Sequence, residues 1–208
     1  MTARDHIAVG LAKIGMVLRS HAWRQAEATG LTPTQAQILV HLVRRGPARV
    51  SALADEIAVS QPTASDAVAA LIRKGHVEKR ADPDDGRAAK LHAKATAKRT
   101  VARMEVWPDA LLEAAHVLDP IEQSAFLKGL TKMIRTLQVS GAVPVQRMCV
   151  TCQYFRPNQY PGAAEPHHCA FVNAAFGNAD LRLDCGDHVE AAAATQEKAW
   201  ARFNRASA

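Results

Sequence analysis

The spacing of apolar residues in the first 45 positions predicts two amphipathic helices. Between residues 5 and 28, apolar side chains recur three or four positions apart and so share one helix face: Ile7, Leu11, Ile14, Leu18 and Ala22. Gly30 is expected to end this helix. A second helix begins at Thr32-Pro33-Thr34-Gln35, a capping-box pattern with proline at the first helical position, and ends at Gly46-Pro47.

The next segment has the pattern of two short helices joined by a tight turn. Leu53 and Ile57 lie four positions apart and share a face of the first helix. Ser51 is expected to cap the start of this helix, because its hydroxyl can accept unpaired backbone N–H groups. Ala58-Val59-Ser60 interrupts the apolar pattern and is predicted to form the turn.

The second helix of this pair is expected to start at Ser60, with Pro62 in its first turn, and to end at Gly75. Its apolar positions follow helical spacing: Ala64, Val68 and Leu71. Short and medium polar side chains lie on its outward face near its start: Gln61, Thr63, Ser65 and Asp66. Side chains of this kind can follow base edges in a DNA major groove.

A short β-hairpin with a charged tip is predicted after this helix. Its strands are expected at residues 76–80 and 88–92. The connecting run Asp82-Pro83-Asp84-Asp85-Gly86 is a turn in which proline fixes φ, aspartate caps and glycine supplies a positive φ. Arg87 is expected to leave this turn on an exposed tip.

Two further helices complete the apolar pattern. Residues 92–118 are predicted to form one long helix, kinked at Trp107-Pro108. Asp119-Pro120-Ile121-Glu122 repeats the cap-plus-proline signature and opens a helix with an apolar face of Phe126, Leu130, Met133, Ile134 and Leu137. Because the outer helices carry more apolar surface than a small domain can bury, a second copy of the chain is expected to cover it as a homodimer.

The helix-turn-helix and its hairpin resemble the winged-helix domain of the MarR family of bacterial regulators, over about residues 5–140. The residues that carry the resemblance are Leu71, Gly75 and the run Asp82-Pro83-Asp84-Asp85-Gly86-Arg87. The family usually has a second charged residue directly before the wing arginine, where this chain has Gly86.

The resemblance implies a mainly α fold with a small β-wing, of the α+β class, that binds a pseudo-palindromic double-stranded DNA operator as a dimer, most simply as a repressor. It places residues 61–66 in the major groove and Arg87 in the minor groove. The full set of candidate DNA-contacting residues is Ser51, Gln61, Thr63, Ser65, Asp66, Arg80, Arg87 and Lys90.

The distribution of charge supports a nucleic-acid partner. The net charge is +6, and residues 1–140 hold 20 Lys and Arg against 14 Asp and Glu, whereas residues 141–208 hold 6 against 6. Between Arg73 and Arg103 there are ten basic residues against four acidic ones. Such a run can be an ordinary solvated helix face, but its overlap with the hairpin favours a surface that faces phosphates.

Several functional classes find no support in the sequence. No apolar run is long enough to span a bilayer, and the first residues lack a signal-peptide cleavage pattern, so a cytoplasmic protein without a membrane partner is expected. No glycine-rich phosphate loop, nucleophile elbow or HExxH helix occurs, so the chain is not expected to be an enzyme.

The composition changes after a linker at residues 141–148. Residues 149–187 contain every cysteine of the chain, and residues 188–208 have the alanine-rich composition of a helix. The cysteines lie within 37 residues in the spacing C-x2-C-x16-C-x15-C: Cys149, Cys152, Cys169 and Cys185. Structural disulfides are rare in a reducing cytosol, and a segment with few aliphatic residues needs another source of stability, so one shared metal centre is predicted.

The identity of this metal stays open between two alternatives. Four thiolates satisfy tetrahedral zinc, but they also suit a 4Fe–4S or 2Fe–2S cluster. The spacing and the aromatic flank Tyr154-Phe155 are similar to the high-potential iron–sulfur proteins, although the final spacing is a residue or two longer here, and this favours a cluster over zinc. His167 and His168 adjoin Cys169 and are expected to support the ligands or face solvent rather than replace a thiolate.

Three functions are compatible with these features. The favoured one is a dimeric DNA-binding regulator whose metal centre senses redox or metal state. The alternative is a repressor of the same kind with a structural zinc and a small-molecule effector. The third is a redox protein or enzyme that uses the winged domain for docking, which the position of the charge excess disfavours.

Overall fold

The structure is a computed structural model that describes residues 1–82, 85–104 and 108–205, with the backbone alone at residues 86 and 87. The chain divides into two compact units, Met1–Ala114 and Ala115–Ala208. The overall class is α+β, with helices throughout and small antiparallel sheets, as the sequence predicts. No helix in the described part of the chain is long and apolar enough to cross a bilayer.

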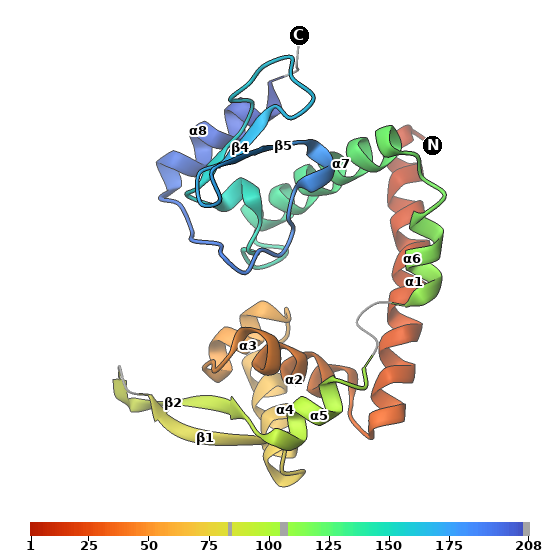
Figure 1. The fold of residues 1–208 in the computed structure, drawn as a ribbon. Helices are drawn as coiled ribbons and strands as arrows, with labels where there is room; N and C mark the ends of the chain where they lie inside the picture. Colours follow the sequence, from red (N-terminus) through yellow and green to blue (C-terminus); the bar gives the residue numbers. More distant parts are fainter. Residues whose placement is uncertain (83–84, 105–107, 206–208) are drawn as a thin grey trace. The chain divides into compact units, whose positions relative to one another are not determined.

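The first unit contains the predicted helix-turn-helix and wing (Figure 1). Its elements are α1 (Ala3–Thr29), α2 (Pro33–Arg45), α3 (Val50–Glu56), α4 (Gln61–Arg73), β1 (Val77–Asp82), β2 (Asp85–Ala93), α5 (Ala95–Val101) and, at the boundary, α6 (Asp109–Ala115). Helices α2, α3 and α4 bury their apolar faces in one core together with β1, β2 and α5. The buried positions include Ile38, Leu39, Leu42, Leu53, Val68, Leu71, Val77, Leu91 and Val101.

Most predicted helix ends are confirmed. Thr32 and Gln35 form the capping box of α2, Ser60 caps α4, and Gly30 follows α1 with a φ of 66°. The predicted cap at Ser51 is wrong, because α3 begins one residue earlier, at Val50, and its N-terminal cap position is Arg49 without a side-chain hydrogen bond. The Ser51 side chain is therefore exposed in the first helical turn.

The wing is longer than the sequence indicated. Strands β1 and β2 pair antiparallel from Val77↔Ala93 to Ala81↔Ala89, and a bulge precedes the last pair, Asp82↔Asp85. The strands therefore extend into the predicted turn, of which Pro83 and Asp84 lie outside the described residues.

The predicted long helix at residues 92–118 is wrong. Strand β2 continues to Ala93, and two short helices follow, α5 and α6, with α6 beginning directly after Pro108. A proline lacks the backbone N–H that a helix interior needs and clashes with the preceding turn, so it begins a helix instead of kinking one. Trp107, the other residue of the expected kink, lies outside the described residues.

The second unit consists of a long helix and a cysteine-rich module. Its elements are α7 (Pro120–Val139), the 3-10 turn η1 (Cys149–Thr151), strands β3 (Phe155–Arg156), β4 (His167–Cys169) and β5 (Ala174–Phe176), the 3-10 turn η2 (Asn178–Asp180), and α8 (Ala193–Asn204). The three strands form one antiparallel sheet in the order β3-β4-β5. The predicted capping box of α7, between Asp119 and Glu122, is confirmed.

Helix α7 belongs to the cysteine module by its packing, whereas the sequence placed it in a domain ending at residue 140. Leu127 and Ile134 pack against a core formed by Met148, Val150, Phe155, Leu181 and Phe203. Met148, expected in a linker at residues 141–148, is fully buried. The boundary therefore falls before α7, and α8 is shorter than the helix expected at residues 188–208.

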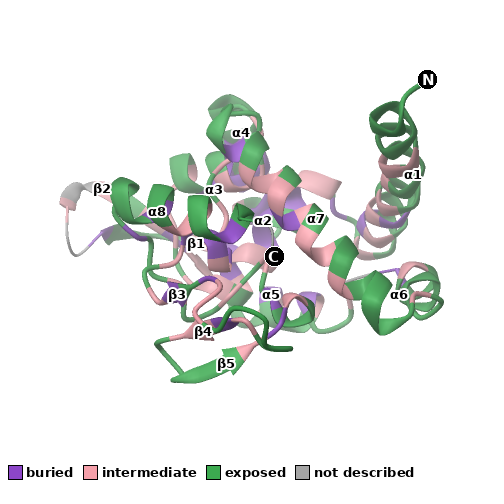
Figure 2. Cartoon of the chain, turned by 90° about the horizontal axis from the view of Figure 1, so that it is seen from above, coloured by how far each residue is buried: buried purple, intermediate pink, exposed green. Residues whose placement is uncertain are grey.

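Burial is uneven among the helices (Figure 2). Helices α2 and α4 carry buried stripes, whereas α1 and α7 leave large apolar side chains exposed. On α1 these are Ile7, Val9, Ile14, Met16, Val17 and Trp23, and on α7 they are Ile121, Phe126, Met133, Leu137 and Val139.

Candidate nucleic-acid interface and candidate metal centre

The first candidate site is the outer face of α4. Its apolar residues Ala64, Val68 and Leu71 are buried, which fixes the helix in the core. All four predicted contact residues at its N-terminal end are exposed: Gln61, Thr63, Ser65 and Asp66.

The cap of α4 also positions one of the candidate base-contacting side chains. The Ser60 hydroxyl accepts the Thr63 backbone N–H at 3.3 Å and lies 2.7 Å from the Thr63 hydroxyl. Thr63 is therefore oriented toward the helix start, while Gln61 and Ser65 extend from neighbouring exposed positions.

The wing is anchored by a buried aspartate. Asp82 has a side chain that is 1% exposed, and Arg49 donates to its Oδ2 from Nε at 2.8 Å and from Nη2 at 2.6 Å. Lys90 Nζ lies 2.8 Å from the other oxygen, and Arg49 also approaches Asp85 at 3.3 Å. Asp82 thus ties the residue before α3 to both strands of the wing, rather than capping the turn as the sequence suggested.

This network changes the expectation for two predicted DNA contacts. The Lys90 ammonium is engaged with Asp82, and Arg80 forms an ion pair with Glu78 on the same strand. Arg80 is exposed and Lys90 is half-buried, and both lie on the strands of the wing. The side chain of Arg87, the predicted minor-groove contact, lies outside the described residues.

The second candidate site is a cavity of about 210 Å³ in the cysteine module. All four cysteines line it, although they come from separate segments: η1, the residue after η1, the end of β4, and the loop after η2. Their burial is similar, since each is partly exposed. The packing therefore gathers the four predicted ligands, Cys149, Cys152, Cys169 and Cys185, around one space.

The cysteines surround this space without converging on a point. Within residues 1–82, 85–104 and 108–205, no three His, Cys, Asp or Glu side chains approach closely enough to hold a single metal ion. The cavity has room for several water molecules.

Aromatic side chains form much of the cavity wall. Tyr154, Phe155, Phe171 and Phe176 all line it, and the rings of Tyr154 and Phe171 lie with centroids 5.3 Å apart. Phe155 and Phe176 continue into the core of the module. The part of the wall formed by Phe155 and Phe176 is therefore fixed by packing, whereas Phe171 is exposed.

Arg182 makes two contacts to cysteine sulfur. Its backbone N–H donates to Cys149 Sγ at 3.3 Å, and its guanidinium Nη1 donates to Cys185 Sγ at 3.8 Å. Burial raises the pKa of the Cys149 thiol to about 11, against the opposing effect of the Arg182 N–H. A thiol with so high a pKa becomes a thiolate at neutral pH only when a cation stabilises it, and metal binding supplies that charge.

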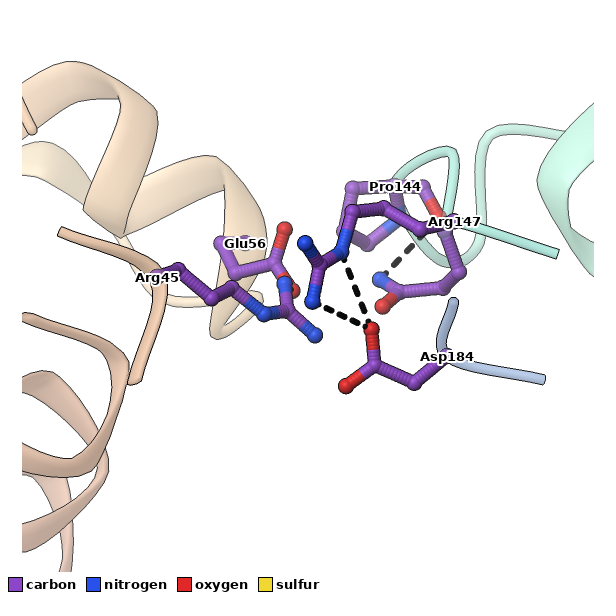
Figure 3. Close-up of polar contacts among 6 residues, drawn as sticks. Arg45, Glu56, Pro144, Arg147 and Asp184 are labelled. Atoms are coloured by element: carbon purple, nitrogen blue, oxygen red, sulfur yellow. Dashed lines mark hydrogen bonds and ion pairs between the residues drawn. The ribbon is translucent and has the colours of Figure 1, made fainter. Parts of the chain in front are cut away.

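Backbone bonds and an ion pair fix the segments that carry two of the cysteines. The Cys149 N–H donates to the Arg182 carbonyl at 3.0 Å, and the Cys185 N–H donates to the Arg147 carbonyl at 2.9 Å. Arg147 also binds Asp184 through Nε at 3.0 Å and Nη2 at 2.8 Å (Figure 3). The two chain segments are thereby held side by side at the cavity.

The two histidines next to Cys169 are bonded elsewhere. His167 is fully buried, where its Nδ1 accepts the Asn158 N–H at 3.1 Å and its Nε2 lies 3.0 Å from Asn178 Oδ1. Since Nδ1 accepts, Nε2 carries the proton and donates to Asn178. Burial lowers the pKa of His167, so the neutral ring is favoured. His168 Nδ1 lies 3.4 Å from the Tyr160 hydroxyl. Both rings thus support the fold of the module.

Sequence reasoning missed Arg49 and Arg182. Arg49 precedes α3 and Arg182 lies three positions before Cys185, which gives neither a distinctive local pattern. Their roles depend on partners 33 positions away in each case, at Asp82 and Cys149. The one usable signal was charge: Arg182 is a basic residue between two cysteines in a segment with few of them.

The first unit has the fold of a winged helix-turn-helix protein, with α4 as its second, outward-facing helix and β1–β2 as its wing. Residues 29–88, which include α4, strand β1 and the start of β2, match the family model described as MarR family. The first unit is therefore similar to the MarR family over these 60 of the chain's 208 residues.

Solved structures share this fold. The S. aureus MepR–DNA complex has a TM-score of 0.53 and 18% identity, and the match covers 66% of this chain and 100% of MepR. The transcriptional regulator BldR from Sulfolobus solfataricus has a TM-score of 0.53 and 22% identity, with 65% and 99% covered. The organohalide-sensing regulator RdhR, solved with 2,4-dichlorophenol, has a TM-score of 0.53 and 18% identity, with 67% and 84% covered. No curated protein matches the sequence significantly.

We expect Asp82→Asn to lower the free energy of unfolding of the winged-helix unit by about 1–3 kcal/mol, because it removes the charge that Arg49 and Lys90 share. Asp55→Asn, at an exposed position of α3, is the matched control and should change stability by less than about 0.5 kcal/mol. Urea unfolding monitored by circular dichroism measures both. Equal effects of the two substitutions would contradict the anchoring role of Asp82.

Proposed function

We propose that this protein is a homodimeric, sequence-specific DNA-binding transcriptional regulator, acting as a repressor and controlled by its cysteine module. The observation that carries the DNA-binding part is the exposed polar face of α4 next to the wing in a domain that is similar to the MarR family. MepR, which has the same fold, is solved as a complex with DNA. The role involves no enzymatic chemistry.

The charge of the first unit suits a phosphate backbone. The basic run Arg73 to Arg103 covers the end of α4, the wing and α5, and it holds ten basic residues against four acidic ones. One of those acidic residues, Asp82, is buried. It is paired with Lys90 of the same run, so the pair leaves the basic excess of this segment unchanged, and affinity should fall steeply with salt.

The proposed minor-groove contact of Arg87 and the proposed base contacts of α4 predict different mutational effects. Arg87→Ala should weaken binding to a pseudo-palindromic operator by about 1–3 kcal/mol if its side chain enters a narrow minor groove. Gln61→Ala and Thr63→Ala should relax base preference at particular positions instead. Fluorescence anisotropy on operator and random duplexes at fixed salt measures both effects. Equal losses on both duplexes for all three variants would contradict sequence reading by α4.

Dimerisation follows from the apolar side chains that α1 and α7 leave exposed. A single chain covers only one face of α7, the one that carries Leu127 and Ile134, and leaves Phe126, Met133 and Leu137 on other faces. A second copy of the chain provides an identical apolar surface, and two-fold symmetry lets the same residues meet their equivalents. Half-site centres are then expected about one helical turn of DNA apart.

Ile14→Lys and Leu137→Lys should each shift the protein toward monomer. Burial of such a side chain is worth about 1.5–3 kcal/mol, and symmetry removes it twice, so the dimer Kd should rise on the order of a hundredfold. Val117→Lys introduces the same change at a side chain that is 81% exposed and outside both helices, and should leave the dimer intact. Sedimentation equilibrium gives the molar masses, and unchanged dimers for both helix variants would argue against this interface.

For the cysteine module we propose an iron–sulfur cluster held by Cys149, Cys152, Cys169 and Cys185. Support comes from the gathering of the four thiols around one cavity, from its aromatic wall, and from the sulfur contacts of Arg182. Such a group supplies a one-electron redox change when bound. Tetrahedral zinc remains the alternative, because four thiolates satisfy it as well once they close on one ion.

The segment that connects this cavity to α7 offers a route for regulation. Asp180 and Arg182 line the cavity, while the turn η2 packs on α7 and Leu181 is buried in the same core as Leu127. A change at the cysteines thus reaches a helix that we assign to the dimer. A shift of the dimer geometry would alter the spacing of the two α4 helices and with it operator affinity.

Loss of any one thiolate should lower metal content sharply while the winged-helix unit stays folded. If the centre senses redox or metal state, each Cys→Ser variant should also change operator affinity, and a tenfold change needs only about 1.4 kcal/mol of coupling. The measurement compares anaerobic holo-protein, apo-protein and the four variants on one operator at fixed salt, with iron, zinc and sulfide analysed in each sample.

The outcomes separate the candidate functions. Iron and sulfide with altered affinity support the sensor. If the protein contains zinc and its operator affinity does not change when zinc is removed, the module is structural. A small molecule would then be the effector, and RdhR, for comparison, is solved with bound 2,4-dichlorophenol. Failure of every form to bind any palindrome in a salt-sensitive way would favour the redox protein instead.

A further inference from the structure

We propose that the guanidinium of Arg182 sets the reduction potential of the metal centre in the cysteine module by stabilising its more negatively charged, reduced form. This inference rests on the proposed iron–sulfur cluster. It assigns a role to one side chain that neither the winged-helix fold nor the four-cysteine pattern provides.

The contacts of Arg182 single it out. Among the charged residues that line the cavity in the described part of the chain, Arg182 is the cation, and Asp180 and Asp187 are anions. Its guanidinium donates to Cys185 Sγ at 3.8 Å, while its backbone N–H donates to Cys149 Sγ at 3.3 Å. Arg182 thus contacts two of the four predicted ligands, and its positively charged guanidinium makes the contact to Cys185.

The direction of the effect follows from charge. Reduction adds one electron from a soluble one-electron reductant, forms or breaks no bond, and makes the centre more negative by one unit. A cation beside a ligand sulfur favours the product of this step, so it raises the potential, while Asp180 and Asp187 lower it. Since both carboxylates line the same cavity, removal of Arg182 would leave their repulsion of the added electron uncompensated.

The effect should also depend on salt. The Arg182 side chain is exposed, so mobile ions reach it and screen its interaction with the sulfurs. A purely structural role for this residue, through the backbone bonds between Arg182 and Cys149, would not vary with ionic strength in this way. The backbone bonds also survive replacement of the side chain, which allows the two roles to be separated.

The experiment compares Arg182→Gln and Arg182→Lys with wild-type full-length protein after anaerobic assembly. Arg202→Gln serves as the matched control, because Arg202 is an exposed arginine of the same module whose guanidinium donates to the Asn158 carbonyl at 3.0 Å rather than to sulfur. Iron and sulfide are measured first, and the potential follows from a spectroscopic titration at low and high salt.

We expect Arg182→Gln to make the potential more negative by up to about 59 mV, which is a tenfold fall in a one-electron reduction equilibrium, and the difference to shrink at high salt. Arg182→Lys should keep most of the wild-type value, and Arg202→Gln should keep all of it.

Equal potentials in cluster-containing wild type and Arg182→Gln would overturn this inference and leave the proposed function standing. A protein that holds zinc and no sulfide would overturn this inference and also the proposed iron–sulfur cluster. If Arg182→Gln and Arg182→Lys both fail to assemble the cluster, the residue is structural and the inference is wrong. If the lysine variant alone assembles, with a potential near wild type, the charge is the essential feature and the inference holds.

Discussion

Helix α7 carries more apolar surface than one copy of the chain can bury, and the organisation of the second unit depends on this constraint. One face of the helix, with Leu127 and Ile134, is covered by the core of the cysteine module. Thr131 and Gln138 are buried along the same face, where the Thr131 hydroxyl donates to the Leu127 carbonyl and the Gln138 amide donates to Met148 Sδ. These bonds satisfy the Thr131 hydroxyl and the Gln138 amide N–H inside an apolar contact, while the buried Gln138 Oε1 has no hydrogen-bond partner among the described residues. The remaining apolar residues of α7 stay exposed, so the helix can serve the module and a second subunit at once.

Most helix starts could be predicted from local sequence patterns, because capping depends on residues that lie within a few positions of one another. Thr32 with Gln35, Ser60 and Asp119 with Glu122 all cap as their spacing predicts. The Ser51 prediction is wrong because a hydroxyl near a helix start is also compatible with the first turn, and the observed cap, Arg49, lies two residues before the predicted one. The match of residues 29–88 to the MarR-family model likewise covers short-range features, the paired helices and part of the adjacent hairpin.

Contacts between distant positions could not be predicted this way. The local sequence predicts Asp82 as a turn residue. Its partner Arg49 lies 33 positions earlier, and the two meet only when the wing has folded. The sequence places α7 in the winged domain because the helix carries a regular apolar stripe. A stripe does not specify which surface will cover it, and in the structure that surface is the core of the cysteine module. The cysteine spacing indicated shared ligands, and the structure places all four around one cavity, whereas the choice between zinc and a cluster depends on distances among sulfurs that spacing does not fix.

The uneven distribution of charge agrees with the proposed roles, in which the first unit binds DNA and the cysteine module regulates it. The first unit, residues 1–114, holds 17 Lys and Arg against 12 Asp and Glu, while residues 115–208 hold 9 against 8, and within them residues 141–208 are balanced at six against six. A module without net charge adds little to the attraction of phosphates, so changes within it can alter DNA binding only through geometry. Geometry is an efficient route, because a tenfold change in affinity requires about 1.4 kcal/mol, less than the burial of one Leu181-sized side chain is worth. Under the proposed regulation, a small displacement of η2 on α7 would therefore supply enough energy for a tenfold change in operator affinity.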